Sequence, residues 1–155
     1  MNMAEITYND GDYVGDLKGS LRHGVGKFIW TLKRDLGHVY EGDWKDDLRT
    51  GKGIHTWPDG RKYEGDFKEN LLDGKGILTW PDGQKYDGGF KDGNRTGKGI
   101  YTWPDGQKYE GDFKDDLISG HGVYTNYTRS TEAKWNAGIA EGIGIYTRPN
   151  GDRFE

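Results

Sequence analysis

Residues 63–85, YEGDFKENLLDGKGILTWPDGQK, decide the fold because the same pattern occurs again on both sides of them. The opening Tyr-x-Gly-x-Trp/Phe-Lys begins at Tyr40, Tyr63, Tyr86 and Tyr109, and a Gly-x-Gly starts eleven residues after each tyrosine. A fixed period of about 23 residues is typical of an array of similar small units, each in contact mainly with its neighbours. Such an array offers one long surface, which favours binding over catalysis in a deep pocket.

Each unit is predicted to be a β-hairpin. Residues 63–68 alternate apolar or small with charged side chains, the period of a half-exposed strand. We expect a loop over residues 69–73, in which Leu71 tucks under the sheet, and a returning strand over residues 74–80. Trp80-Pro81-Asp82-Gly83 then indicates a turn, because Pro presets φ and Gly accepts a positive φ.

The repeat divides the chain into six units with altered ends. The units are expected at residues 13–39, 40–62, 63–85, 86–108, 109–130 and 131–153. Residues 1–12 are interpreted as a partial unit and residues 154–155 as a truncated seventh. In the sixth unit Thr131 and Ala133 replace the tyrosine and the first glycine. An open strand edge at Phe154 predicts a C-terminal homodimer.

The recurring tyrosines and glycines are assigned a structural role. Glycine inside a strand usually marks a bend or the close approach of another group. We therefore expect rings of one hairpin to lie over the glycines of its neighbour, in place of an aliphatic core. The structural positions are Tyr40, Gly42, Gly51, Gly53, Tyr63, Gly65, Gly74, Gly76, Tyr86, Gly88, Gly97, Gly99, Tyr109, Gly111, Gly120 and Gly122.

Composition limits the class of protein. Only 32% of the 155 residues are hydrophobic, but 14% are aromatic, which favours a folded array over a disordered chain. The net charge of −4 comes from interleaved charges, so no basic patch for nucleic acid is predicted. Cysteine is absent, and no apolar stretch approaches the roughly 20 residues of a transmembrane helix. The N-terminus also lacks the apolar segment of a signal peptide, so a cytoplasmic protein is expected.

The pattern resembles the MORN repeat (membrane occupation and recognition nexus), and the resemblance covers residues 13–153. It implies an all-β fold: an elongated, single-layered antiparallel sheet of stacked hairpins with a groove along one face. It also implies a scaffold or adaptor associated with the cytoskeleton or with membranes. MORN repeats occur fused to lipid kinases and to a lysine methyltransferase, whose catalytic domains lie elsewhere in those chains.

No catalytic, cofactor or metal site is predicted. Gly51-Lys52-Gly53 and its copies are followed by strand residues, whereas a phosphate-binding loop opens a helix. The four histidines occupy different places in their units and have no metal-ligand spacing. No nucleophile–base pair can be nominated, so a non-enzymatic protein is expected.

The candidate site is a groove lined by the sixteenth and eighteenth positions of the units, which share a face with the tyrosines. A single-layered sheet has no second layer to cover such rings, and exposed Trp and Tyr dominate binding energy. The predicted groove residues are Trp30, His55, Trp57, Leu78, Trp80, Tyr101, Trp103, Tyr124 and Tyr146. The alternative is that these rings only stack on one another and on glycine.

Three occupants of this surface are considered. A protein partner, laid lengthwise as an amphipathic helix, is favoured. Peripheral binding to anionic phospholipid is the alternative, motivated by a column of lysines on the opposite face. The net negative charge and the acidic residue beside each lysine argue against it, and the opposite face is expected to be a solvated surface of cross-strand charge pairs. Carbohydrate binding ranks last.

Overall fold

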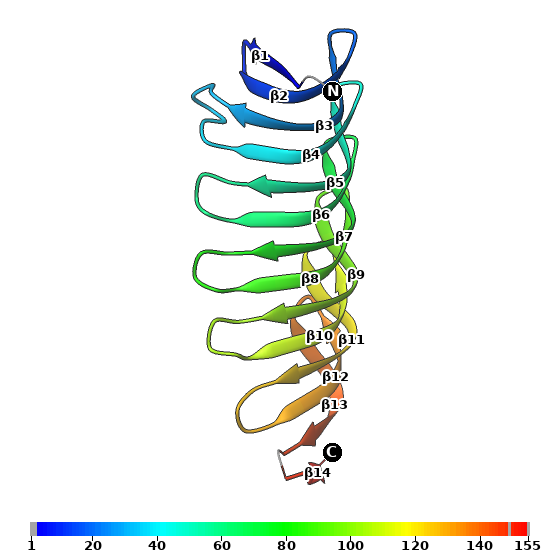
Figure 1. Ribbon diagram of the computed structural model, residues 1–155. Coiled ribbons are helices and arrows are strands. Elements are labelled where there is room, and N and C mark those ends of the chain that lie inside the picture. Colours follow the sequence, from blue (N-terminus) through cyan, green and yellow to red (C-terminus); the bar gives the residue numbers. More distant parts are fainter. Residues whose placement is uncertain (1–2, 149, 155) are drawn as a thin grey trace.

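The chain forms one open antiparallel sheet in which every strand lies between its predecessor and its successor. The computed structural model describes residues 3–148 and 150–154, and the side chains at positions 143 and 146 lie outside the described part. Figure 1 shows hairpin stacked on hairpin from the N-terminus to the C-terminus. The fourteen strands are β1 Ala4–Tyr8, β2 Gly11–Lys18, β3 Leu21–Trp30, β4 Val39–Lys45, β5 Leu48–Thr56, β6 Lys62–Lys68, β7 Leu71–Thr79, β8 Lys85–Lys91, β9 Asn94–Thr102, β10 Lys108–Lys114, β11 Leu117–Thr125, β12 Ser130–Asn136, β13 Ile139–Thr147 and β14 Arg153–Phe154. The predicted all-β fold of stacked hairpins is confirmed.

A tight turn closes each hairpin at one end. Between β6 and β7 it consists of Glu69 and Asn70, whose φ angles of 46° and 72° are those of a type I′ turn. The predicted loop over 69–73 is therefore too long, because β7 already begins at Leu71. Leu71 pairs with Lys68 and is 46% exposed, whereas Leu72 pairs with Phe67 and packs against the core. The predicted inward position of Leu71 is wrong by one residue, since side chains alternate between the two faces.

The opposite ends are joined by the Trp-Pro-Asp-Gly turns. The amide of Gly83 donates to the carbonyl of Trp80 at 3.0 Å. The amide of Trp80 donates to the carbonyl of Gln84, also at 3.0 Å. Successive turns are neighbours, since the Cγ of Pro81 would lie 2.9 Å from a methyl group at Gly60. The first unit differs, because a longer loop over residues 31–38 joins β3 to β4.

Each hairpin is bent by a bulge. In β6 and β7, Gly65 faces Gly76, but Phe67 faces Leu72, so β7 contains extra residues between these pairs. Gly74 sits in the bulge with φ of +114°, which explains the first glycine of each Gly-x-Gly. Asp66 fixes the bulge because its Oδ2 accepts a hydrogen bond from the amide of Lys75 at 2.9 Å. Bulges bend the strand that carries them, and each hairpin accordingly curves through its middle (Figure 1).

The tyrosines lie over glycines of their own hairpins. The hydroxyl of Tyr63 donates to the carbonyl of Asp66 at 2.8 Å, and this bond holds the ring across the sheet. A methyl group at Gly76 would overlap that ring, and no other atoms come as close. The expectation that rings cover glycines of the neighbouring hairpin is therefore wrong for the tyrosines, whereas the indoles of Trp44 and Trp135 do bond to a glycine carbonyl of the preceding hairpin. The hydroxyl reaches a carbonyl three residues along its own strand, which keeps each ring above its own unit.

Rings at the first and fifth positions form a continuous edge-to-face ladder. Tyr40, for example, contacts Trp44 of its own unit at 5.1 Å between ring centroids and Phe67 of the next unit at 5.0 Å. The ladder runs through Tyr13, Trp44, Tyr40, Phe67, Tyr63, Phe90, Tyr86, Phe113, Tyr109 and Trp135. Such contacts add to the free energy of burial. The ladder replaces an aliphatic core.

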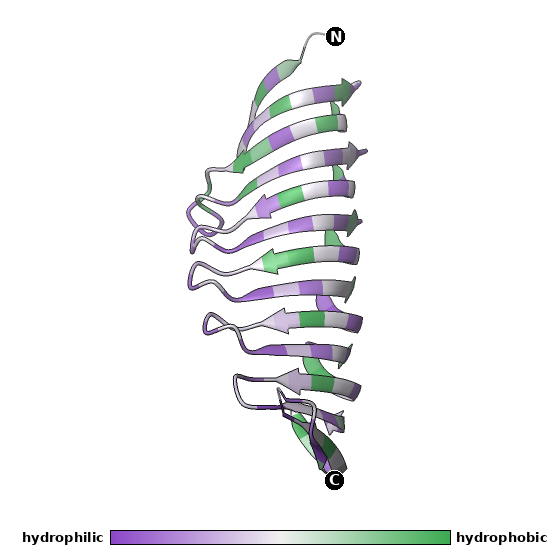
Figure 2. Cartoon of the chain, turned by 60° about the horizontal axis from the view of Figure 1, so that its bottom comes forward, coloured by the Kyte–Doolittle hydropathy of each residue, from purple (hydrophilic) through white to green (hydrophobic). Residues whose placement is uncertain are grey.

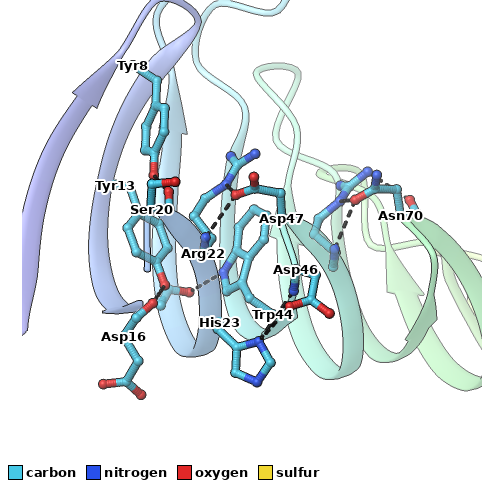
Figure 3. A network of polar contacts seen from close by, with 12 residues as sticks. Tyr8, Tyr13, Asp16, Ser20, Arg22, His23, Trp44, Asp46, Asp47 and Asn70 are labelled. Carbon is cyan, nitrogen blue, oxygen red and sulfur yellow. Dashed lines mark hydrogen bonds and ion pairs between the residues drawn. The ribbon is translucent and has the colours of Figure 1, made fainter. Parts of the chain in front are cut away.

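The ladder is covered by side chains from the curled ends of the hairpins. Arg22 lies 4.5 Å from the ring centroid of Trp44, and its Nε donates to Asp47 at 3.0 Å. Figure 3 shows this guanidinium above the indole, whose Nε1 donates to the carbonyl of Gly26 at 3.0 Å. Arg49, Leu72, Arg95 and Ile118 occupy the same place in later units. The sheet thus buries a core between the two halves of each bent hairpin, without a second sheet.

The opposite, outer face carries charge pairs. Lys52 meets Asp66 across strands at 2.5 Å, and Lys98 meets Asp112 at 2.6 Å. Lys62 and Glu64 pair along one strand at 3.4 Å. Hydrophilic and hydrophobic residues alternate along the strands in Figure 2, as the period of two predicts. β14 lies at one edge of the sheet, and the homodimer predicted there stays a prediction.

Candidate partner-binding groove

The sixteenth and eighteenth positions form a second row of rings beside the buried ladder. Trp30 ends β3, and Trp57, Trp80 and Trp103 follow the ends of β5, β7 and β9. All four indoles are half-buried. Tyr101 links Trp80 and Trp103, with centroid distances of 5.8 and 4.8 Å, and Trp103 contacts Tyr124 at 5.7 Å. These rings form the floor of what we call the aromatic groove.

The groove has two unlike walls. One wall is the row of Trp-Pro-Asp-Gly turns, and the other is the row of curled hairpin ends. Between them lie a hollow of about 430 Å³ and one of about 240 Å³. Trp57 and Leu72 line both hollows, so the two hollows are neighbours along the array.

The four groove indoles keep their N–H groups unpaired. Trp44 and Trp135 each donate to a backbone carbonyl, at 3.0 and 3.1 Å. Within the described residues, no such bond is made by Trp30, Trp57, Trp80 or Trp103, and no buried side-chain nitrogen lacks a partner. The four Nε1 atoms therefore reach solvent. They are hydrogen-bond donors available to a bound molecule.

His55 lies beneath the groove floor and is only 5% exposed. Arg49 Nη1 donates to His55 Nδ1 at 3.0 Å, so the proton of the neutral ring sits on Nε2, which donates to His38 Nδ1 at 3.0 Å. Burial, reinforced by the charge of Arg49, lowers the pKa of His55 to about 3. His55 therefore supports Trp30 and Trp57, at 5.7 and 4.5 Å, as a neutral ring.

The remaining predicted groove residues lie on the same face where the structure describes them. Leu78, Tyr101 and Tyr124 are half-buried beside the indoles. The hydroxyl of Tyr101 donates to Gln84 Oε1, and that of Tyr124 donates to Gln107 Oε1. Tyr146 belongs to β13, but its side chain lies outside the described residues.

Two sets of residues were missed from the sequence. Arg49 and Arg95 cover the rings, whereas charged residues near a turn are normally interpreted as solvated. The outer face also has an apolar row, Ile54, Ile77, Ile100 and Val123, with open hollows of about 700 and 540 Å³ along it. The sequence contained a signal for this apolar row. Lys52 and Ile54 are two residues apart in their strand, as are the equivalent residues of later units, so the period of two places them on the same face. Only the charged members of that face entered the prediction.

The described residues hold no group of three or more His, Cys, Asp or Glu side chains that could bind a metal ion. Over the same residues, no helix is long and apolar enough to cross a membrane. The geometry is that of a repeat protein with an extended aromatic surface.

Comparison with known proteins names the repeat. The MORN repeat model matches residues 13–31, 40–60, 63–85, 86–108, 109–131 and 132–153. The chain therefore belongs to the MORN repeat family, as the sequence pattern predicts.

Two curated relatives share part of the array. Phosphatidylinositol 4-phosphate 5-kinase 1 of Oryza sativa subsp. japonica is 40% identical over 52 residues, which are 33% of this chain and 6% of the kinase. MORN repeat-containing protein 3 of Xenopus laevis is 37% identical over 51 residues, 33% of this chain and 20% of that protein. The aligned part of this chain consists of MORN repeats, so the similarity to the kinase is one of repeats.

A solved structure shares the fold over nearly the whole chain. It is the TCP domain of SAS-4 (dCPAP) of Drosophila melanogaster, in complex with a proline-rich motif of Ana2 (dSTIL). The TM-score is 0.56 at 16% identity, covering 98% of this chain and 88% of the other. At this identity the likeness concerns the fold alone.

Proposed function

We propose that the chain is a non-enzymatic scaffold whose aromatic groove receives a segment of a partner protein running along the array. The observation that carries the proposal is the line of four half-buried indoles with unpaired N–H groups. Trp and Tyr are the residues that most often dominate binding free energy. The complex of the TCP domain with a peptide motif supports this function, because that domain has a similar fold.

The outer face is the competing surface, since its hollows are larger. Its apolar members are single aliphatic side chains, and they stand beside ion pairs such as Lys52–Asp66. A partner would have to displace or bury those pairs, which costs desolvation free energy. The groove offers rings and free donors instead, and for this reason we favour it.

Binding to anionic phospholipid is the second candidate, and the charges argue against it. The lysine column that motivates it consists of Lys45, Lys68, Lys91 and Lys114, of which Lys91 pairs with Asp73 at 2.8 Å. Elsewhere on the outer face, Lys52 and Lys98 lie within 2.6 Å of a carboxylate. Neutralised cations attract an anionic surface weakly. A cytoskeletal or membrane-junction adaptor would thus reach its location through a protein partner.

The experiment is affinity capture from cell extract with three chains of verified fold. The parent is compared with W57A/W80A/W103A and with the matched outer-face variant I54T/I77T/I100T, which keeps β-branched residues in the strands. We expect a protein captured by the parent and by the outer-face variant but lost with the groove variant. Equal capture by all three would contradict the proposal. Salt-sensitive sedimentation with phosphoinositide vesicles would favour the lipid alternative.

A further inference from the structure

We infer that the occupant of the aromatic groove is a proline-rich segment in the polyproline II conformation, with proline at every third residue and basic residues among the others. This inference rests on the proposed function and names the partner segment that the groove would take. Spacing, hydrogen-bond donors and charge each support it.

The spacing of the indoles matches the pitch of polyproline II. Trp57, Trp80 and Trp103 recur once per unit, and a unit contributes two strands to the sheet. Adjacent strands are about 4.8 Å apart, so the indoles recur about every 9.6 Å. Polyproline II has three residues per turn and a rise of about 3.1 Å, so one turn covers about 9.3 Å. A segment along the groove would therefore present one residue per turn to each indole.

An α-helix fits the same spacing less well. Its closest return to one face at this distance is seven residues, or about 10.5 Å. Over the three intervals from Trp30 to Trp103 the mismatch with the indoles grows to roughly 3 Å. The amphipathic helix considered from the sequence is therefore the less suitable occupant.

The unpaired indole donors also favour polyproline II. Its backbone has no internal hydrogen bonds and leaves its carbonyls free to accept, whereas the carbonyls of an α-helix accept from their own chain. Trp30, Trp57, Trp80 and Trp103 present four such donors in one line. Aromatic-lined grooves are the usual receptors of proline-rich segments.

The turn wall of the groove adds a charge requirement. Asp59 is paired with Arg61 at 2.8 Å, but the equivalent Asp82 and Asp105 have no cation partner among the described residues. They accept instead from the amides of Gln84 and Gln107, at 2.9 and 3.0 Å. Asp82 also lies close enough to Tyr101 to help raise its pKa, although burial of that hydroxyl is the larger cause. Two carboxylates without a cation partner thus lie two residues beyond Trp80 and Trp103, and they favour lysine or arginine on the part of the ligand that lies over these turns; the hollows themselves are lined by Arg49, Arg61 and Arg95.

The test uses defined peptides with fluorescence anisotropy. The probe is fluorescein-labelled (Pro-Pro-Lys)4, and the register control is (Pro-Pro-Lys-Gly)3, which has the same length and a four-residue period. A twelve-residue Ala/Lys helix with four lysines is the conformational control. We expect the first peptide to bind at least tenfold more tightly than either control at physiological salt. This comparison needs no protein variant.

Variants then locate the site. W57F/W80F/W103F keeps three rings but removes their donors, and we expect about a fivefold loss of affinity for each hydrogen bond that is lost. D82N/D105N should weaken binding and reduce its dependence on salt. The outer-face variant I54T/I77T/I100T should bind as the parent does. Circular dichroism verifies the fold of each variant.

Two results would overturn the inference: equal affinity for the three peptides, or full affinity of the W57F/W80F/W103F variant for the proline peptide. The inference and the proposed function can fail separately. If the captured partner depends on the groove tryptophans but its binding segment lacks a three-residue proline period, only the inference fails. If capture is indifferent to those tryptophans, the proposed function fails as well.

Discussion

Tyr63 and Gly76 act as a pair, because the ring occupies the space that a side chain at position 76 would need. The sixth unit shows what happens when the ring is missing. Thr131 stands at the tyrosine position there, and a methyl group added at Gly144 would find its nearest neighbours at 3.3 to 3.6 Å. The glycine is thus required by the tyrosine above it.

This pairing predicts a non-additive double mutant. We expect Gly76→Ala to destabilise the fold by about 2 kcal/mol through overpacking. The same substitution made in a Tyr63→Thr background should cost at least ~1 kcal/mol less. Urea unfolding of the parent, both single variants and the double variant measures this coupling. Strict additivity would mean that ring and glycine do not interact.

The buried tyrosines predict alkaline unfolding. Burial raises the pKa of Tyr13, Tyr86 and Tyr109 to about 12, from an ordinary value of 10. Their contribution to stability is complete below pH 10 and is lost as the pH rises toward 12, because the unfolded chain then releases protons that the folded chain keeps. Each tyrosine lowers the free energy of unfolding by about 1.4 kcal/mol per pH unit in this range. Urea titrations from pH 8 to 11.5 should show a shallower slope for Tyr86→Phe but not for Tyr127→Phe, whose ring is exposed.

His55 predicts the opposite behaviour in acid. Its pKa is lowered to about 3 in the folded chain, so the neutral ring stabilises the fold above pH 6.5. That contribution falls as the pH drops from 6.5 toward 3, because only the unfolded chain takes up the proton. Between pH 7.5 and 5, His55→Leu should lose about 2 kcal/mol less stability than the parent. Leu78 occupies the equivalent place in the next unit, and exposed His121→Gln is the control. Identical pH profiles for parent and His55→Leu would refute this assignment.

At the scale of one hairpin, the residues of the tight turns are not the ones that would make the fold most stable. Glu69 has φ of 46°, a conformation that costs most residues with a side chain about 1 kcal/mol and asparagine less. We expect Glu69→Asn to raise the free energy of unfolding by about 0.5 kcal/mol. Glu64→Asn, inside strand β6, should instead lower it. Urea midpoints decide, and a loss of stability with Glu69→Asn would contradict the turn geometry.

The hairpins also show how far sequence alone could go. Tyrosine and glycine spacing predicted the stacked hairpins, because side-chain alternation and turn chemistry are local. The curl of each hairpin was not predictable, since it depends on the bulge at Gly74 and on the bond from Lys75 to Asp66. For the same reason Arg49 was missed as a cover of the rings. The shared face followed from alternation, since eight of the predicted groove residues lie on one face of the sheet, His55 buried among them; that this face binds a partner stays a prediction.

At the scale of the whole molecule, each hairpin contacts only its neighbours, and the aromatic ladder runs through the junctions. Every junction repeats one contact, a tyrosine against the fifth-position ring of the next unit. Stability should therefore be close to a sum over units and junctions. The row of groove indoles is continuous over the first four units, each of which adds one tryptophan, whereas Asn126 and Arg148 stand at this position in the last two units.

Removal of one complete unit tests this architecture and the groove together. Deletion of residues 63–85 joins Lys62 to Tyr86 in the same pattern, so Tyr40 can contact Phe90 in place of Phe67. We expect a cooperative but less stable fold, shorter by two strands or about 9.6 Å in small-angle scattering. Deletion of residues 63–74, about half a unit, breaks the register and should unfold the array. The chain that lacks residues 63–85 retains Trp30, Trp57 and Trp103, with Trp57 and Trp103 now one unit apart. Its affinity for (Pro-Pro-Lys)4 should therefore fall without being abolished, whereas complete loss would mean that Trp80 alone forms the site.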